Sequence, residues 1–560
     1  MSRRAANRRI RLLGAALALA LAIALARAGW IQVVRASSLA KLADAQQTQT
    51  IPVPAPRGAI FDRNDVELAA NEDSVTISAD PKFVKYPATE ARQAAAVLGL
   101  DRQAEAELRS ALSDRSKGFV YVYRQAPVAK AGKLKRLKLA GFDYQIEPKR
   151  VYPQGTLAAQ TLGFAGIDNR GLAGLEVEYD HSLTGHDGKQ TVVRDPAGSV
   201  IDVRGTSYEK AGADLTLTID STIQHYVQQV LAQARKRWQA RSASALVLDP
   251  HSGAVLAMGT APTYNANNFS QTSLPLQLNR PVTDAYEPGS TFKLVTVAGA
   301  LSEGLVSPQT SFTLPYSIRV GGKPIHDSHR RGTERMSVAK ILTVSSNVGV
   351  ATISTQLLGS ERLARWIKRF GFGNKTGVDF PGESRGIVLP RDQWYGSAVG
   401  TIPIGQGIAV TSTQLAAAYA AIANKGVWVQ PHLVARVGNN AAPTPKRRRV
   451  VTPAVAAQLM TMFGSVVDKG TGTEAEIPNY SVAGKTGTAQ KPDSTGHYST
   501  TKYVASFVGI VPASAPRLVI LVTVDEPKSS IWGGSVAAPA FKQIALDCLR
   551  YLEVPPDRPN

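Results

Sequence analysis

The sequence contains a single cysteine and lacks the common metal-binding motifs and repeats. Cys548 stands alone, which excludes an internal disulfide and any metal site built on cysteines. No H-E-x-x-H string occurs, so a zinc enzyme of that type is excluded, and we expect neither a metal nor a cofactor. The 47 glycines and 33 prolines follow no G-X-Y period, which rules out a collagen-like chain.

Acidic residues are scarce relative to basic ones. The 64 Lys and Arg outnumber the 43 Asp and Glu, which gives a formal net charge of +21. Such a charge suits nucleic acid or an anionic membrane surface. No zinc-finger, basic-zipper or RNP-like pattern supports nucleic acid, so no nucleic-acid partner is expected. With 44% hydrophobic and 19% charged residues the chain is globular, and 560 residues imply about three domains or two large ones.

The N-terminus carries the longest apolar run. Five arginines between positions 3 and 11 precede residues 12–26, which are almost wholly Leu and Ala, and apolar residues resume at Trp30. A helix over 12–34 is long enough to cross a membrane, with Arg27 reaching the interface. A cleaved signal peptide is the competing interpretation, because residues 26–28 have the A-x-A form. In both cases the basic flank is expected in the cytoplasm and the rest outside it.

Two regions of different texture follow. In the first, residues 36–50, 92–112 and 128–139 are expected to be helical, prolines forbid a helix over 51–58, and the glycine-rich residues 150–188 are expected to be irregular. From residue 214 the pattern predicts a large mixed α/β domain whose strands come from both ends. Its expected elements are a strand at 214–220, a helix capped by Asp220, a hairpin over 244–258, strands at 503–511 and 517–524, an exposed loop at 441–449 and a closing helix at 538–552.

A serine and a lysine three residues apart are the sharpest chemical feature. Pro288 and Gly289 end one segment, and the apolar run that follows predicts a buried helix with Ser290 in its first turn and Lys293 on the same face. A serine needs a base to become a nucleophile, and a desolvated lysine can be that base. S-x-x-K occurs five times in the chain, so this spacing alone is weak evidence.

Two further motifs single out this copy. Ser345-Ser346-Asn347 is the only S-x-N in the chain. In an extended turn, side chains two residues apart point the same way, so Ser345 and Asn347 could face the same side. In Lys485-Thr486-Gly487-Thr488, Lys485 and Thr488 offer a cation and a hydroxyl to a substrate carboxylate, while Gly487 would let a ligand approach the backbone. A second K-T-G at 375–377 lies among glycines and is interpreted as a structural loop.

The ordered set S-x-x-K, S-x-N, K-T-G resembles that of the penicillin-binding proteins. The chain is identified as similar to class B members, and more to the division-specific FtsI type than to the elongation type. The resemblance covers nearly all of the chain beyond the anchor and departs from S-D-N at Ser346. It also rests on segments outside the three motifs: Arg57–Asn64, Arg150–Pro153, Gly174–Glu176 with Tyr179, Asn279–Asp284, Gln414–Tyr419 and Gly533–Pro539.

The resemblance implies a serine-type D,D-transpeptidase and a role for each motif residue. Ser290 would attack the D-Ala–D-Ala carbonyl of a stem peptide, Lys293 would be its base, and Ser345 would relay a proton to the leaving amine. Asn347 would hold an amide of the acyl group. The terminal carboxylate would be bound by Lys485, Thr486 and Thr488 in the K-T-G segment that includes Gly487. The backbone N–H groups of Ser290 and Thr488 would form the oxyanion hole.

The resemblance also implies a domain plan and partners. Residues 1–11 would be a cytoplasmic tail, 12–34 the membrane anchor, 35–210 a β-rich non-catalytic pedestal, 211–554 the transpeptidase domain and 555–560 a tail. The expected catalytic fold is an antiparallel sheet with helices on both faces plus a helical subdomain. Expected partners are lipid II-derived glycan strands with their stem peptides, β-lactams, an FtsW-type membrane glycosyltransferase and other division proteins.

Alternative functions remain open on the sequence. An elongation-type transpeptidase and a D,D-carboxypeptidase share the three motifs. A β-lactam hydrolase would need a water-activating base, and the E-x-x-L-N string typical of one class is missing. A β-lactam-acylated sensor or scaffold is the non-enzyme alternative.

Overall fold

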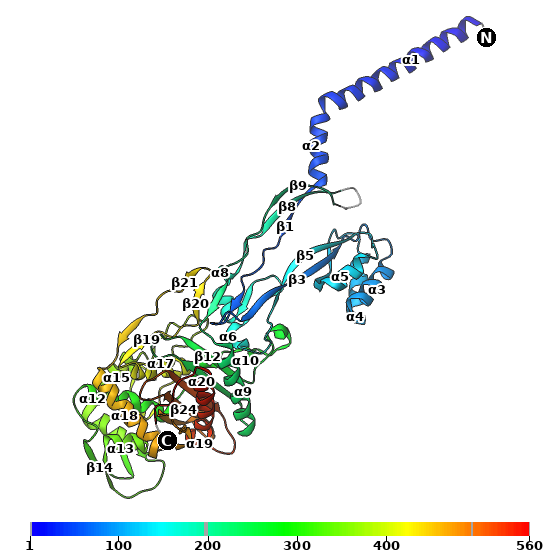
Figure 1. Cartoon of the computed structure of the whole chain (residues 1–560). Helices are drawn as coiled ribbons and strands as arrows, with labels where there is room; N and C mark the ends of the chain where they lie inside the picture. The colour runs from blue at the N-terminus through cyan, green and yellow to red at the C-terminus, as the bar shows by residue number, and fades with distance from the viewer. Residues whose placement is uncertain (1–2, 195–199, 494, 496, 559–560) are drawn as a thin grey trace. The chain divides into compact units, whose positions relative to one another are not determined.

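A computed structural model of the chain describes residues 3–194, 200–493, 495 and 497–558 (Figure 1). The chain forms two compact units that interleave along the sequence. The first unit comprises residues 1–56, 73–148 and 185–211. The second unit comprises residues 57–72, 149–184 and 212–560. Parts of the expected pedestal, 57–72 and 149–184, therefore pack with the catalytic region, while the functional domain boundaries stay predictions.

The first unit begins with a long apolar helix. Helix α1 (Arg3–Gly29) continues through η1 (Trp30–Val34), and together they form a helical stretch of 32 residues with a segment long and apolar enough to cross a membrane. None of these residues is buried within the chain, as a lipid-facing helix requires. Helix α2 (Ala36–Gln47) follows and ends where strand β1 (Thr48–Val53) begins, so the helix predicted over 36–50 is three residues too long.

The rest of the first unit is built on a three-stranded sheet and on the strands that pair with the later part of β3. Strand β1 pairs antiparallel with β8 (Gly188–Arg194), which pairs with β9 (Val200–Ser207). The later part of β3 (Glu67–Ala79) pairs with β4 (Val120–Pro127) and with β5 (Phe142–Val151). Helices cover this sheet around a shared apolar core: α3 (Pro87–Leu98), α4 (Arg102–Ser113) and α5 (Val128–Lys135).

The single helix predicted over 92–112 is wrong, because the chain breaks it in two. Gly99 takes a left-handed conformation with φ 81° and ends α3. The Asp101 carboxylate then accepts a 2.8 Å hydrogen bond from the Ala104 amide and starts α4.

The second unit is built on a five-stranded antiparallel sheet. Its order is β12 (Val255–Ala261), β11 (Ser242–Leu248), β25 (Leu518–Asp525), β24 (Tyr498–Val511) and β23 (Ala483–Pro492). Of the two early strands, β11 pairs with the late strand β25, as Ala245 opposite Val522 illustrates, and β12 pairs with β11. The predicted hairpin and closing strands are confirmed, and β23 lies at the edge of the sheet.

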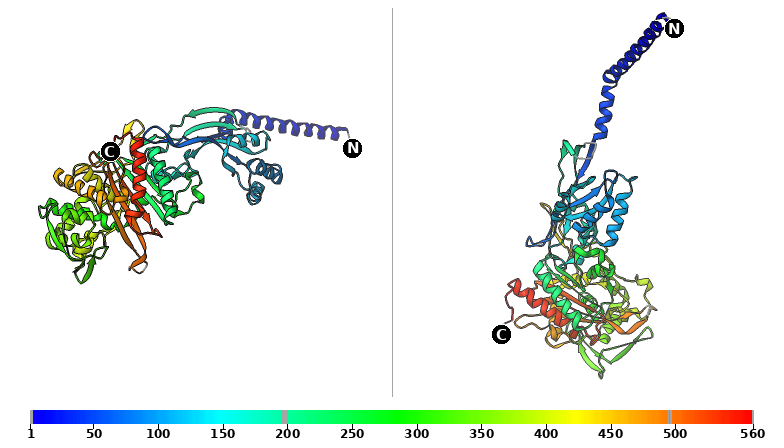
Figure 2. Two further views of the ribbon diagram at one scale, coloured as in Figure 1. Left: turned by 60° about the horizontal axis from the view of Figure 1, so that its bottom comes forward. Right: turned by 90° about the vertical axis from the view of Figure 1, so that its right-hand side faces the viewer.

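Helices cover both faces of this sheet, as predicted. On one face lie α9 (Ser221–Arg237) and α20 (Ala538–Tyr551), which run beside each other in Figures 1 and 2. On the other lie α12 (Lys293–Ser302), α17 (Ser412–Ala423) and α18 (Pro453–Lys469). Strand β11 shows why both faces are apolar: Ala245 joins the core with α9, and Leu246 joins the core with α12.

Local signals explain the start of α9 and the fate of the basic loop. The Asp220 carboxylate accepts hydrogen bonds from the Thr222 and Ile223 amides, so the predicted cap is confirmed. The exposed loop predicted over 441–449 is wrong at its end. Residues 447–449 form strand β22 (Arg447–Arg449), which pairs with β19 (Val427–Val429).

The second unit contains further helices and strands, most of them short. They include β2 (Ile60–Phe61), α6 (Ala159–Leu162), β6 (Phe164–Ala165), β7 (Gly171–Ala173), α7 (Gly174–Glu178), α8 (Asp180–Leu183), β10 (Leu215–Leu217), α10 (Leu274–Gln277), α11 (Arg280–Thr283), β13 (Ala285–Tyr286), η3 (Gly289–Phe292), β14 (Ser311–Leu314), β15 (Ser317–Val320), β16 (Lys323–His326), β17 (Glu334–Ser337), α13 (Val338–Thr343), α14 (Asn347–Thr352), α15 (Gly359–Phe370), α16 (Ala398–Thr401), β18 (Val410–Thr411), β20 (Val434–Val437), β21 (Asn440–Ala441) and α19 (Gly533–Val536).

A buried ion-pair cluster joins three of the segments that carry the family resemblance. The Glu176 carboxylate accepts from Arg57 Nε at 2.6 Å and from Arg150 Nε at 2.7 Å, and its side chain is 0% exposed. The Tyr152 hydroxyl donates a further hydrogen bond to the Glu176 carboxylate at 3.1 Å. Because these residues come from 57–72 and 149–184, the cluster joins these two segments of the second unit to each other.

Candidate active site

The turn that carries Ser290 is fixed by its neighbours. Residues Gly289–Phe292 form the 3₁₀ turn η3, which runs directly into α12 at Lys293. In a 3₁₀ turn residues i and i+3 eclipse each other, so Ser290 and Lys293 share a face, as predicted. Gly289 has φ 53°, and a Cβ there would lie 2.8 Å from the Thr488 carbonyl oxygen. Only glycine therefore lets the turn pack against strand β23, which carries Thr488.

Lys293 points from α12 to the S-x-N motif. Its side chain is completely buried. Its Nζ donates to the Ser345 carbonyl and, at 2.8 Å, to Asn347 Oδ1, and it lies 3.1 Å from Ser345 Oγ. In the described part of the chain, the Ser290 hydroxyl is not hydrogen-bonded to Lys293. Catalytic hydrogen bonds often close only when substrate binds, so this geometry suits an enzyme without substrate.

A second buried lysine reaches the same serine. Lys485 comes from edge strand β23, is 0% exposed, and its Nζ lies 2.9 Å from Ser345 Oγ. The Ser345 hydroxyl therefore lies between the two amines. The sequence predicted that Ser290, Lys293, Ser345, Asn347 and Lys485 belong to one site, and the structure brings the last four into direct contact.

Ser345 reaches both lysines by an unusual backbone conformation. Its φ is 58°, which is left-handed and uncommon for a residue with a side chain. The extended turn expected at Ser345–Asn347 is therefore wrong, although both side chains do reach Lys293. Asn347 begins helix α14, and its Nδ2 donates to the His326 carbonyl at 3.0 Å. Both ends of the Asn347 amide are thus engaged by the protein.

The K-T-G strand packs against the Ser290 turn. A Cβ on Gly487 would lie 2.3 Å from Ser506 Oγ and 2.9 Å from the Pro288 carbonyl oxygen. The sequence predicted that Gly487 would let a ligand approach the backbone. On this side of the strand, Ser506 and Pro288 of the protein make that close approach instead. Thr488 Oγ1 accepts a 3.1 Å bond from the Gly533 amide, and Thr486 Oγ1 lies 2.7 Å from Thr471 Oγ1.

Comparisons with known proteins agree with this geometry. The family model of the penicillin-binding protein transpeptidase domain matches residues 243–546, more than half of the chain, and that of the penicillin-binding protein dimerisation domain matches 52–217. The chain belongs to the class B penicillin-binding proteins.

Individual relatives extend over nearly the whole sequence. The peptidoglycan D,D-transpeptidase FtsI of Escherichia coli is 34% identical over 538 residues, covering 95% of this chain and 90% of that protein. Stage V sporulation protein D of Bacillus subtilis is 34% identical over 557 residues, covering 95% and 83%. The crystal structure of penicillin-binding protein 3 of Mycobacterium tuberculosis with aztreonam has a TM-score of 0.72 and 32% identity, covering 91% of this chain and 99% of that one.

Burial sets the charge of the two lysines in this penicillin-binding protein. Removal from water lowers the pKa of Lys293 well below its ordinary value, and the nearby Lys485 lowers it further, while Asp327 opposes the shift. Burial also lowers the pKa of Lys485, to about 7. The lowered pKa lets Lys293 lose its proton more easily than a lysine in water, so that it can accept one from a serine, as a general base must.

Asp327 is the residue of this site that the sequence analysis missed. Its carboxylate accepts from Ser346 Oγ at 2.9 Å, from the Val348 amide at 3.0 Å and from Arg331 Nη2 at 2.6 Å. It thereby fixes the turn that holds Ser345 and Asn347. Asp327 follows β16 and belongs to no recognised motif, so only the tertiary contact shows its role. Ser346, which stands where S-D-N has aspartate, is the side chain it binds.

The second K-T-G has a structural role, as predicted. The Thr376 amide and hydroxyl and the Gly377 amide all donate to the Glu383 carboxylate, at 2.6, 2.5 and 3.0 Å. These bonds close a loop, and they leave Thr376 without a free hydroxyl proton for a substrate.

Proposed function

We propose that this protein cross-links peptidoglycan by acyl transfer through an acyl-enzyme on Ser290. The observation that carries the proposal is the pair of buried lysines, Lys293 and Lys485, that meet at Ser345 Oγ beside the Ser290 turn. A serine next to a desolvated amine is an activated nucleophile. The names of the relatives, which include a peptidoglycan D,D-transpeptidase, support the same chemistry.

The first half-reaction forms the acyl-enzyme. Ser290 Oγ attacks the carbonyl between the two terminal D-Ala residues of a stem peptide, and neutral Lys293 takes the serine proton. The backbone N–H groups of Ser290 and Thr488 stabilise the oxyanion, each worth about 2.7–4 kcal/mol of barrier by analogy with other oxyanion holes. The proton then passes through Ser345 to the leaving amine, the peptide C–N bond breaks, and D-Ala departs. The position of Ser345 Oγ, 3.1 Å from Lys293 Nζ, supports this relay.

The second half-reaction transfers the acyl group. An acceptor amine of a neighbouring peptide attacks the Ser290 ester and loses its proton to the same relay, which forms the cross-link and frees Ser290. Before acylation, Lys485, Thr486 and Thr488 bind the terminal carboxylate of the donor, which leaves with D-Ala, and Gly487 shapes the strand between them. Asn347 binds an amide of the acyl group by exchanging its bond to Lys293 or to the His326 carbonyl.

The N-terminal helix supplies the location. The apolar helix over Arg3–Val34 carries arginines at its beginning, which supports a single-pass membrane anchor with a cytoplasmic N-terminus and the catalytic unit outside. A division role beside an FtsW-type glycosyltransferase and other division proteins is our proposal. The name of one relative, FtsI, supports the division role. We also propose that β-lactams acylate the same serine, which the similar structure with aztreonam supports.

Product analysis tests the proposal. The full-length protein in detergent is incubated with a synthetic stem peptide ending in D-Ala–D-Ala and with an acceptor amine, and products are separated by mass. We expect release of D-Ala and a product in which donor and acceptor are joined. Release of D-Ala with only hydrolysed donor would favour a carboxypeptidase, and no release at all would overturn the proposal.

Matched lysine variants assign the correct K-T-G. Lys485→Ala should abolish product formation, because the buried amine next to Ser345 is lost. Lys375→Ala, which changes the other K-T-G, should retain it. Equal losses in both variants would contradict our choice of motif.

A further inference from the structure

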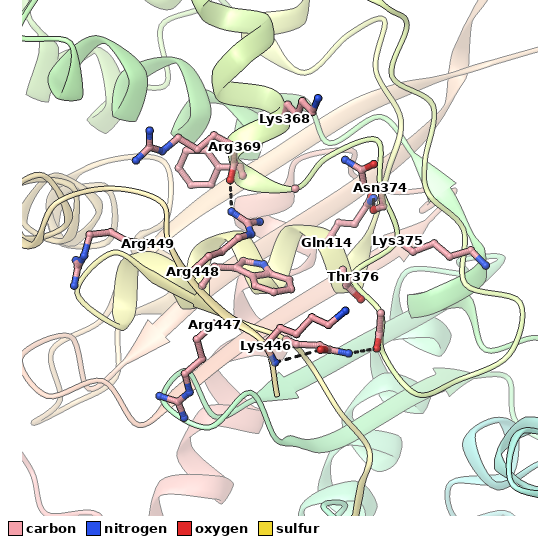
Figure 3. Close-up of a pocket in the computed structure, with 15 residues that line it drawn as sticks. Lys368, Arg369, Asn374, Lys375, Thr376, Gln414, Lys446, Arg447, Arg448 and Arg449 are labelled. Carbon is pink, nitrogen blue, oxygen red and sulfur yellow. Dashed lines mark hydrogen bonds between the residues drawn. The ribbon is translucent and has the colours of Figure 1, made fainter. Parts of the chain in front are cut away.

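A basic pocket lies in the second unit apart from the acylation site. It has a volume of about 610 Å³ and lies between the end of α15, the loop at 371–377, the start of α17 and the strands β19 and β22 (Figure 3). None of its lining residues is one of the motif residues Ser290, Lys293, Ser345, Asn347 or Lys485. This size is typical of pockets that bind small molecules.

The four consecutive basic residues Lys446 to Arg449 all line the pocket, and they point in two directions. Successive side chains of a strand face opposite sides, so Lys446 and Arg448 share one side and Arg447 and Arg449 the other. In Figure 3 the Lys446 amine is directed towards Thr376 and the Arg448 guanidinium towards Arg369, whereas the side chains of Arg447 and Arg449, which also line the pocket, extend away from these two. The Arg449 guanidinium donates instead to the Lys425 carbonyl at 3.0 Å.

Arg448 is held in a fixed position. Its guanidinium lies over the Trp428 ring, 4.6 Å from the centroid, and donates to the Arg369 carbonyl. A Cβ on Gly371 would come within 2.9 Å of Arg448 Nη2, so the glycine leaves room for it. Burial, with Arg369 nearby, lowers the pKa of Arg448, which indicates a partly desolvated cation without a compensating charge. An arginine oriented in this way presents its planar donors at low entropic cost.

The pocket contains no carboxylate to balance its cations. Within the described residues none of its basic lining residues forms an ion pair; they are Lys368, Arg369, Lys375, Lys446, Arg447, Arg448 and Arg449. The nearby Glu383 is occupied by the amides of Thr376 and Gly377. Cations gathered around one cavity repel each other, and a bound anion relieves that repulsion.

We propose that this pocket binds a phosphate-bearing anion. An arginine and several lysines facing one cavity suit a group with more than one negative charge and several acceptor oxygens. The volume exceeds that of a lone phosphate, so the phosphate is carried on a larger molecule or belongs to a pyrophosphate. The source is a lipid headgroup or a soluble phosphate. The proposal does not depend on the acyl-transfer function.

Titration of the full-length protein in uncharged detergent tests the site. Inorganic pyrophosphate is added at constant ionic strength, and binding is followed by calorimetry. We expect saturable binding that Lys446→Gln with Arg448→Gln weakens by about tenfold or more, because each lost charged hydrogen bond alone accounts for about that factor. Arg447→Gln with Arg449→Gln removes the same charge from the other side of the strand and should change the affinity less than threefold.

Further arms secure the fold and separate the two sources. Arg448→Lys keeps the charge and should bind pyrophosphate with an affinity within about tenfold of that of the unmodified protein. This variant tests the proposal even if a Gln variant fails to fold. A short-chain anionic phospholipid is added below its critical micelle concentration. It should displace pyrophosphate if the natural ligand is a lipid headgroup, and should leave pyrophosphate bound if the ligand is a soluble phosphate. Both results support the site, provided that the variants change pyrophosphate binding as stated. Equal weakening in both Gln pairs, or no saturable binding of either probe, would overturn the proposal.

Discussion

Two lysines that are buried without a carboxylate partner dominate the site at the scale of residues. In the described chain neither Lys293 nor Lys485 forms an ion pair, and Asp327 lies close enough only to influence the first. Charged amines in such places are costly, so each loses its proton more easily than a lysine in water. The useful state is neutral Lys293 beside protonated Lys485, since one must accept a proton and the other must attract a carboxylate.

This division of labour predicts a bell-shaped pH profile. Below the lowered pKa of Lys293 the base is protonated and inactive, so the second-order rate constant of acylation should rise with pH as Lys293 is deprotonated. Above the pKa of Lys485, about 7, the cation that attracts the substrate carboxylate is lost and the rate constant should fall. Labelling by a fluorescent penicillin across pH measures both limbs. Lys485→Arg cannot lose its proton, so a descending limb that persists unchanged in this variant would contradict the assignment.

Asp327 is predicted to act on catalysis by positioning. Asp327→Asn removes the charge that raises the pKa of Lys293, so the ascending limb should move to lower pH. It also weakens the bonds to Arg331 and Ser346, so the maximal acylation rate should fall about tenfold, the effect of one lost charged hydrogen bond. Glu334→Gln, in the exposed pair with Lys340, is the control and should change neither. An unmoved ascending limb in Asp327→Asn would show that Asp327 is only structural.

The motif residues were predictable and Asp327 was not, for a physical reason. Ser290 and Lys293 are joined by local helical spacing, which the sequence displays. Ser345 was found through its motif, although its left-handed backbone was not foreseen, because nothing local to a serine demands φ 58°. Asp327 reaches Ser346 only through the fold, so no spacing rule marks it.

At the scale of elements, edge strand β23 must lie directly against the Ser290 turn. Gly487→Ala would place a Cβ 2.3 Å from Ser506 Oγ and 2.9 Å from the Pro288 carbonyl, which forces the strand and the turn apart. We expect acylation by penicillin to slow by about a hundredfold, the typical cost of misplacing reacting groups by about 1 Å.

A second glycine on a helix gives the matched control. Gly464 lies in α18, and a Cβ there would meet nothing within 4 Å. Gly464→Ala should leave acylation unchanged and stabilise the protein by about 0.5–1 kcal/mol. Similar acylation rates in the Gly487→Ala and Gly464→Ala variants would disprove the packing argument.

Elements with strong local signals were predictable, and those that depend on partners were not. The Asp220 cap and the apolar stripe of α9 define that helix in the sequence alone. Strand β22 consists of three arginines and looks like a solvated loop, yet it pairs with β19 and packs Arg448 on Trp428. Pairing with a distant strand overrides its local character.

At the scale of the whole molecule, the two units are not consecutive in sequence. Residues 57–72 and 149–184 belong to the second unit, where Arg57, Arg150 and Glu176 form their buried cluster. The family segments at these positions suggested a separate pedestal. The sequence alone does not show that these segments belong to the catalytic unit, because the ion pairs of the cluster join residues far apart in the chain.

The cluster predicts a large effect on stability. Glu176→Ala leaves two buried guanidinium groups without a partner and should destabilise the second unit by about 3–5 kcal/mol. Asp468→Ala breaks the exposed pair with Arg558 and should cost at most about 1 kcal/mol. Thermal unfolding of the two variants measures the difference, and equal melting temperatures would show that the cluster does not hold the segments.

The central claim is that Ser290 is the nucleophile of this penicillin-binding protein. Mass spectrometry of the full-length protein after reaction with penicillin, followed by peptide mapping, identifies the acylated residue. The account predicts one adduct, on the peptide containing Ser290, and none in Ser290→Ala, whose unfolding temperature should match that of the unmodified protein. An adduct on another serine, or an adduct that persists in folded Ser290→Ala, would contradict it.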